Sequence, residues 1–182
     1  MPQPWLDLDT TVLAQTRVFD LRQVQRASPK DGRPHAFWVL DPPDWVNVVA
    51  LTDDGMLLFV EQWRHGTREV TTEIPAGMVD PGETAEQAAR RELLEETGYE
   101  PGSLVEIGCV EPNPAIQSNR CRTFLAKGCR PVRAPHFDTT EDCRLRLEPA
   151  AQAAHWVRSG KLSHALVVAA LTHAFLRGDL PV

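Results

Sequence analysis

Apolar residues recur along the first half of the chain in short runs that predict β-strands. Residues 45–52 (WVNVVALT) are apolar on both faces, which is typical of a central buried strand. After the turn TDDG, residues 56–64 (MLLFVEQWR) predict another strand. Upstream, apolar and polar residues alternate loosely along residues 16–27. The turn residues SPKDGRP separate this segment from HAFWVL at 35–40. This arrangement predicts an N-terminal β-hairpin.

Capping residues mark the ends of the predicted helices. Thr84 and Gln87 form the T-x-x-Q pattern of a capping box, and Gly98 suits a left-handed C-terminal cap, so a helix is expected between them. Two later helices are expected at 150–159, with Pro149 at the first position and Gly160 past the end, and at 164–177, between Ser163 and Gly178. Shorter strands are expected at 69–77, 104–110, 120–126 and 143–148. Strands and helices are intermixed, so the fold class is α/β or α+β.

Length and charge narrow the class of function. The chain of 182 residues is long enough for one domain with a small N-terminal appendage. The net charge of −6 argues against binding to nucleic acid or to anionic membranes. A polyanionic substrate is still compatible, because a bound metal reverses the sign of a local site. The first residues resemble no secretory signal and the four cysteines form no C-x-x-C pair, so we expect a cytoplasmic protein with reduced thiols.

The helix expected after Thr84 carries an unusual concentration of negative charge. Glu92, Glu95 and Glu96 stand at positions i, i+3 and i+4, which share one face of an α-helix. Like charges this close repel one another, and a hard divalent cation such as Mg²⁺ would relieve the repulsion. The alternative is a solvated acidic face that pairs with Arg90 and Arg91.

The spacing around these glutamates favours the metal site. Residues 77–99 match the pattern Gx5Ex7REUxEExGU, in which U is a bulky apolar residue. At the last position Tyr99 replaces the usual aliphatic residue. Seven fixed residues, each with a frequency of roughly one in fifteen, give a chance match on the order of 10⁻⁸ per window. The matching residues are Gly77, Glu83, Arg91, Glu92, Leu93, Glu95, Glu96 and Gly98. This stretch resembles the Nudix box, the signature of the Nudix hydrolase family.

The resemblance implies an α/β/α sandwich with a mixed sheet, and hydrolysis that depends on Mg²⁺, for which Mn²⁺ can substitute. Metal ligands would be Glu92, Glu95 and Glu96, of which Glu96 is also counted as catalytic, together with the carbonyl of Ala76. Glu83 and Arg91 would support catalysis by bracing the loop against the helix.

Stretches outside the box resemble the ADP-ribose and nucleotide-sugar pyrophosphatase branch of that family. In VEQWRHG, Arg64 occupies the position of a substrate-binding arginine, and Gly77 lies in the adjoining loop EIPAGMVDPGE. Pro114 lies where ADP-ribose pyrophosphatases carry a characteristic proline, although turn geometry alone explains a proline there. Asn119 replaces an expected glutamate, which leaves room for GDP-mannose or another nucleotide sugar. We expect all four residues to bind substrate.

A late loop, TTEDCRLRLEP, resembles the segment that supplies the catalytic base. Glu141 is the first candidate and Asp142 the second; a merely solvated acidic loop is the alternative. Residues 1–42 are expected to form strands that contribute to a homodimer, and residues 43–182 the Nudix domain. Trp38 and Trp45 are expected to pack in a core rather than to stack on a nucleobase.

The predicted function is therefore metal-dependent hydrolysis of the pyrophosphate bond in ADP-ribose or a related nucleoside diphosphate sugar. The products would be a nucleoside monophosphate and a sugar phosphate. Two alternatives stay open: a non-catalytic sensor with the same fold, and a hydrolase that acts on dNTPs or capped RNA.

Overall fold

The computed structural model describes residues 1–136 and 143–182. Within these residues the chain divides into two compact units. The first unit contains residues 1–43 and 111–120, and the second contains residues 44–110 and 121–182. No helix in the described ranges is long and apolar enough to cross a membrane. The expected division of the sequence at residue 42 into two domains stays a prediction.

The first unit is built on a three-stranded antiparallel sheet in the order β1-β2-β3. The predicted hairpin corresponds to β2 (Asp20–Ala27) and β3 (Pro34–Asp41), which pair in register. The structure adds β1 (Leu6–Gln15), whose sequence LDLDTTVLAQ begins with strict apolar–polar alternation. Trp38 was expected in a core but is 55% exposed on β3.

The second unit contains a mixed sheet of eight strands in the order β11-β5-β4-β10-β8, with β6, β7 and β9 beside β5, β4 and β10. The central pair β4 and β10 is parallel, and the other pairs are antiparallel. Its strands are β4 (Trp45–Thr52), β5 (Met56–Arg64), β6 (Glu69–Glu73), β7 (Ala76–Met78), β8 (Tyr99–Glu100), β9 (Ser103–Val110), β10 (Cys121–Pro131) and β11 (Cys143–Pro149).

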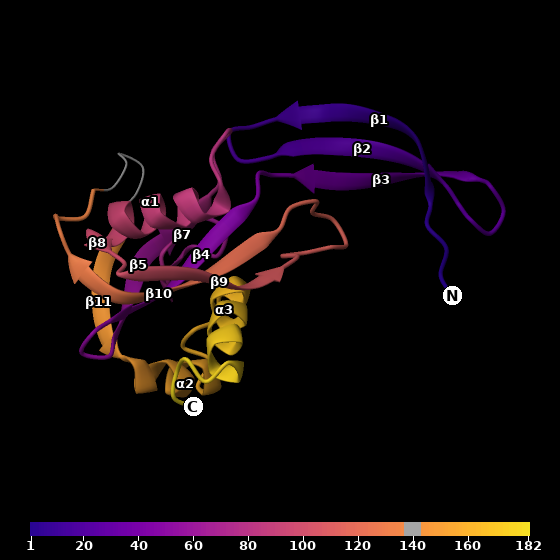
Figure 1. Cartoon of the computed structure of the whole chain (residues 1–182). Helices are drawn as coiled ribbons and strands as arrows, with labels where there is room; N and C mark the ends of the chain where they lie inside the picture. Colours follow the sequence, from indigo (N-terminus) through magenta and orange to yellow (C-terminus); the bar gives the residue numbers. More distant parts are fainter. Residues whose placement is uncertain (137–142) are drawn as a thin grey trace. The chain divides into compact units, whose positions relative to one another are not determined.

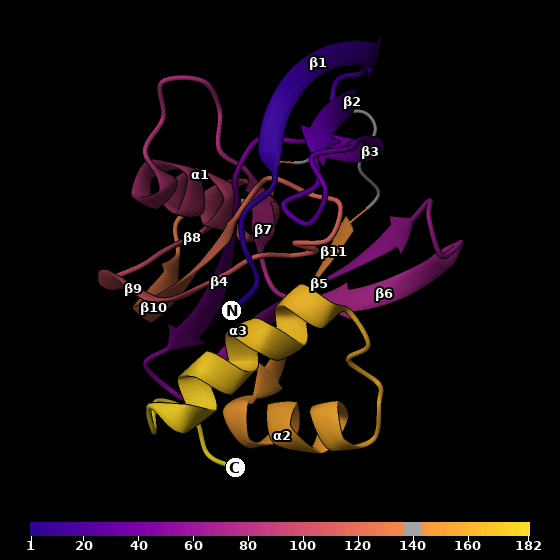
Figure 2. The same cartoon turned by 90° about the vertical axis from the view of Figure 1, so that its right-hand side faces the viewer.

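Helices cover both faces of this sheet (Figures 1 and 2). The side chains of β4 alternate between the two faces. Val46 and Val48 pack against α1 (Ala85–Thr97), whereas Val49 packs against α2 (Ala150–Arg158) and α3 (Ala165–Leu176). A strand that is apolar on both faces is what a sheet between two helical layers requires. The predicted α/β/α sandwich is confirmed.

The ends of α1 follow the predicted capping residues. The Thr84 hydroxyl accepts from the backbone of Gln87, whose side chain accepts from the backbone of Thr84, and Gly98 ends the helix at a φ of 76°. The later helices depart slightly from prediction. Pro149 is the N-cap of α2 rather than its first helical residue, and His164, not Ser163, precedes α3.

Candidate active site

The packing of α1 turns its acidic face toward β7. Leu93 is fully buried against the sheet together with two alanines of the same helix, so positions 92 and 96 lie at the junction with β7. The Ala76 backbone N–H donates to Glu96 Oε2 at 3.0 Å. A Cβ on Gly77 would lie 1.9 Å from Glu92 Oε1, so only glycine admits this carboxylate. Two of the predicted metal ligands are therefore seated directly on the backbone of β7.

Arg91 connects the loop before α1 to the acidic face. Its guanidinium donates to both carboxylate oxygens of Glu83, at 3.0 and 2.9 Å, and to the Met78 carbonyl at 2.9 Å. It also contacts Glu92 at 2.7 Å and Glu95 at 3.2 Å. The Arg91 hydrogen bond lowers the pKa of Glu83, and the Glu83 hydrogen bond raises the pKa of Arg91. The pair that was predicted to brace the loop lies in contact.

The donor set around β7 is suited to a hard divalent cation. Carboxylate and carbonyl oxygens are the ligands of Mg²⁺, and Mg²⁺ uses only one or two protein carboxylates, with water and phosphate oxygens completing its shell. Among the described residues, no three carboxylate, histidine or cysteine side chains converge into a cage. Glu92 and Glu96 beside the Ala76–Gly77 backbone fit this open kind of site, which substrate would complete.

Arg64, the predicted substrate-binding arginine, has a partner that the sequence did not reveal. Its Nε and Nη2 donate to Oε1 and Oε2 of Glu73, each at 2.6 Å. The Thr71 hydroxyl donates to Glu73 Oε1 at 2.6 Å, and His164 Nε2 lies 3.9 Å from Oε2. Arg64 also interacts electrostatically with Glu96. Glu73 directly precedes the apolar Ile74 in the strand predicted at 69–77, but the basic residue that it meets depends on how this strand pairs with β5.

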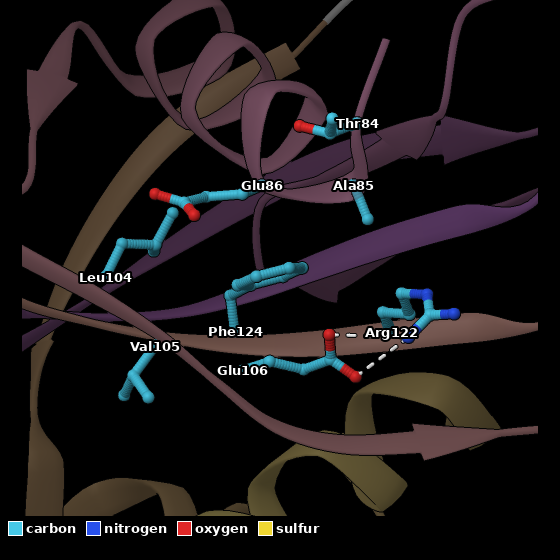
Figure 3. A pocket seen from close by; sticks show the side chains of 8 residues that line it. All are labelled: Thr84, Ala85, Glu86, Leu104, Val105, Glu106, Arg122 and Phe124. Atoms are coloured by element: carbon cyan, nitrogen blue, oxygen red, sulfur yellow. Dashed lines mark hydrogen bonds and ion pairs between the residues drawn. The ribbon is translucent and has the colours of Figure 1, made fainter.

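A separate shallow cavity of about 520 Å³ lies between the first turn of α1 and the strands β9 and β10 (Figure 3). Arg122 pairs there with Glu106 at 3.0 Å. None of the predicted site residues lines this cavity. Its lining residues are Thr84, Ala85, Glu86, Leu104, Val105, Glu106, Arg122 and Phe124.

Comparison with protein families agrees with the acidic helix and its loop. The family model described as "NUDIX domain" matches residues 42–169. The chain belongs to the Nudix family. This assignment makes α1 the Nudix helix, and the match covers well over half of the sequence.

Several relatives of this Nudix chain have named activities. An ADP-ribose pyrophosphatase from Bacillus subtilis (strain 168) is 34% identical over 111 residues, which are 61% of this chain and 60% of that protein. An ADP-ribose pyrophosphatase from Mycobacterium tuberculosis is 31% identical over 137 residues, 73% of this chain and 66% of that protein. The chain thus spans less than two thirds of each relative's length.

A crystal structure of an ADP compounds hydrolase has a similar fold to this Nudix protein. Its TM-score is 0.84 at 23% identity, and the match covers 98% of this chain and 97% of the other. Similarity at this level of identity shows the fold alone.

Two predicted substrate residues of the Nudix protein belong to the first unit, whereas Arg64 and Gly77 belong to the second. Pro114 lies in a turn in which the Asn113 carbonyl accepts hydrogen bonds from the backbone N–H groups of Ile116 and Gln117. Asn119 is buried and its side-chain amide donates to the Pro43 carbonyl at 3.0 Å. Within the first unit, Asn119 thus joins the 111–120 segment to the end of β3.

The predicted catalytic bases of the Nudix protein, Glu141 and Asp142, lie outside the described residues. The described segment before them is attached to the Nudix helix. The backbone N–H groups of Val132 and Arg133 donate to the Gly98 carbonyl, and that of His136 donates to the Glu95 carbonyl at 2.8 Å. The chain therefore passes directly beside a predicted metal ligand six residues before position 142.

Proposed function

We propose that this Nudix protein hydrolyses the pyrophosphate bond of ADP-ribose or a related nucleoside diphosphate sugar. The products are a nucleoside monophosphate and a sugar phosphate. The observation that carries the proposal is the acidic face of α1, seated on the Ala76–Gly77 backbone with Arg91 behind it. The names of the two bacterial relatives support the substrate class.

The residues of the chain divide the work of this reaction. Glu92, Glu95 and Glu96, with the Ala76 carbonyl, hold Mg²⁺ or Mn²⁺, which when bound neutralises the pyrophosphate and lowers the pKa of water. Arg91 and Glu83 keep the loop before α1 in place. Glu141, or Asp142 in its place, accepts the proton of the attacking water.

Four residues are assigned to substrate recognition in this proposal. Arg64 binds the pyrophosphate through its guanidinium, for which a planar fork of donors is suited. Gly77 admits the close approach of substrate and carboxylate to the backbone. Pro114 and Asn119 are further substrate-binding residues, and an asparagine at 119 extends the substrate range to GDP-mannose.

The first unit provides the surface for a homodimer in this proposal. Every residue of β1 is exposed, and this strand presents four large apolar side chains, Leu6, Leu8, Val12 and Leu13. Exposed apolar residues on an edge strand are typical of an interface with another chain. Light scattering of the intact protein should give twice the 20.3 kDa chain mass; a monomer would refute the dimer. A cytoplasmic location, which keeps the four cysteine thiols reduced, belongs to the same proposal.

A substrate panel, read by chromatography of the nucleoside monophosphate that is formed, tests the function. We expect ADP-ribose, GDP-mannose or UDP-glucose to be cleaved with Mg²⁺ and not after EDTA treatment, while dNTPs and capped RNA are cleaved slowly. Turnover of dNTPs alone would overturn the substrate class, and tight ADP-ribose binding without any turnover would indicate a sensor.

Matched variants on α1 test the site. Glu96→Gln should lower kcat by about 10²-fold or more, because it removes a charged ligand where transition-state charge develops. Glu86→Gln changes a glutamate that is exposed on the same helix and should leave kcat unchanged. Glu141→Gln should also lower kcat by about 10²-fold. Equal activity of the two α1 variants would refute the metal site.

A further inference from the structure

Glu73 is a buried carboxylate that the proposed chemistry does not use. Its side chain is 1% exposed and lies at the end of β6. Burial alone would raise the pKa of Glu73, but the hydrogen bonds from Arg64 and Thr71 outweigh it and lower the pKa. An ionised carboxylate is stable in such a place only when each oxygen is paired. Arg64 supplies a donor to each oxygen, and Thr71 supplies a second donor to Oε1.

The same contacts fix the direction of the Arg64 side chain. Arginine has five N–H donors in one plane, and the bidentate contact with Glu73 uses two of them. The Nη1 edge of the guanidinium is therefore directed away from Glu73. The Arg64 side chain is 40% exposed, so donors remain accessible to a ligand. A guanidinium held on one edge loses little rotamer freedom when a phosphate binds the other edge.

A short and rigid path joins this pair to the acidic face of α1. Only Ile74 and Pro75 separate Glu73 from Ala76. The Pro75 carbonyl accepts from Val48 of β4 at 2.8 Å, and the Ala76 N–H donates to Glu96 at 3.0 Å. Glu73 is thus anchored on the backbone segment against which the metal ligands are seated.

We propose that Glu73 is a positioning residue that holds the Arg64 guanidinium so that its remaining donors face the pyrophosphate beside α1. The proposal rests on the proposed function, because it concerns how that substrate is bound. Glu73 touches no substrate and acts only through Arg64. The pair favours a substrate that brings phosphate oxygens to this position, since these oxygens accept the planar array of donors that Arg64 presents.

A double-mutant cycle on kinetics separates positioning from general support of the fold. Arg64→Lys, Glu73→Gln and the double variant are compared with the wild type on the nucleotide sugar that it cleaves. Each single variant should raise KM by about 10-fold, because each loses the bidentate contact between Arg64 and Glu73. The change in kcat should be smaller. The double variant should be no worse than either single variant, since both remove the same function.

Arg146→Lys is the matched control. Arg146 also binds two carboxylates, Glu61 at 2.9 Å and Glu148 at 2.6 Å, but it lies over Trp156 on the α2 side of the sheet. Its KM should equal that of the wild type. If Glu73→Gln fails to fold, Thr71→Val removes the hydroxyl contact to Glu73 at 2.6 Å, together with a long contact to the Gln62 carbonyl at 3.5 Å, and should raise KM by about 2- to 3-fold.

Three results would overturn the positioning role. The first is a KM for Glu73→Gln that equals the wild-type KM; where Glu73→Gln is unfolded, the KM of Thr71→Val is used instead. The second is a KM in the double variant that rises by the product of the two single-variant increases. The third is a rise of KM in Arg146→Lys as large as that in Arg64→Lys. Failure of the proposed function is distinct, because it shows as a wild type that cleaves no nucleotide sugar. The cycle is then measured on whichever pyrophosphate compound of the panel the wild type cleaves, or by calorimetric binding of ADP-ribose where it cleaves none.

Discussion

Arg91 should contribute far more to stability than its neighbour Arg90, although both are arginines on α1. Arg91 is 27% exposed and binds Glu83 through two hydrogen bonds, besides its contacts with Met78, Glu92 and Glu95. A hydrogen bond between charged groups contributes about 1.5–3 kcal/mol, and bonds that share one guanidinium do not add fully, so about 3 kcal/mol is expected for Arg91→Ala.

The exposed neighbour is the control for this change. Arg90 is 46% exposed and forms one i,i+4 pair with Glu86, a kind of pair that contributes about 0.3–0.5 kcal/mol. For a chain of this size each kcal/mol shifts Tm by about 2–4 °C, so Arg91→Ala should lower Tm by about 6–12 °C and Arg90→Ala by about 1–2 °C. Differential scanning calorimetry measures both. Since both changes are Arg to Ala on one helix, helix propensity cancels, and equal Tm values would refute the bracing role of Arg91.

Three further outcomes are expected. Gly77→Ala should lower kcat/KM by about 10²-fold while circular dichroism stays unchanged, because its Cβ would force Glu92 to move by an ångström or more; normal turnover would contradict this. The pKa of Glu73 is lowered in the fold from its ordinary value of 4.5, so the ionised carboxylate stabilises the fold fully above about pH 4.5 and loses this contribution as the pH falls further. Glu73→Gln should therefore make Tm fall less steeply as the pH is lowered below 4.5. Maleimide labelling at pH 7.5 should modify the exposed Cys109 before Cys121, whose pKa burial raises to about 12, as peptide mass spectrometry would show; equal rates would contradict it.

Local signals were sufficient for α1 and its surroundings. The capping box, Gly98 and the doubly apolar strand at 45–52 each depend on neighbours in sequence, and each has its predicted place. The strand β1 was missed although its alternation was visible, because no strong turn signal separated it from the predicted hairpin.

Contacts between distant segments could not be predicted from one sequence. Arg64 was expected to bind substrate, but its tie to Glu73 depends on how β5 and β6 pair, with Arg64 opposite Glu69 and Val60 opposite Glu73. Likewise, nothing local to Asn119 indicates that it binds the carbonyl of Pro43, 76 residues earlier. Such pairings are set by strand register and loop closure, which sequence spacing alone does not reveal.

The crossing of residues 132–136 over the end of α1 has a consequence for which substitutions this chain can tolerate. All the hydrogen bonds described between this segment and the helix join main-chain atoms, and Gly98 permits the close approach, since a Cβ there would lie 2.1 Å from the Arg133 carbonyl oxygen. Mutations of the side chains in this segment therefore leave its attachment intact. Side chains of this segment can therefore vary beside the acidic face at little cost, provided that position 98 remains glycine and the donating N–H groups are kept.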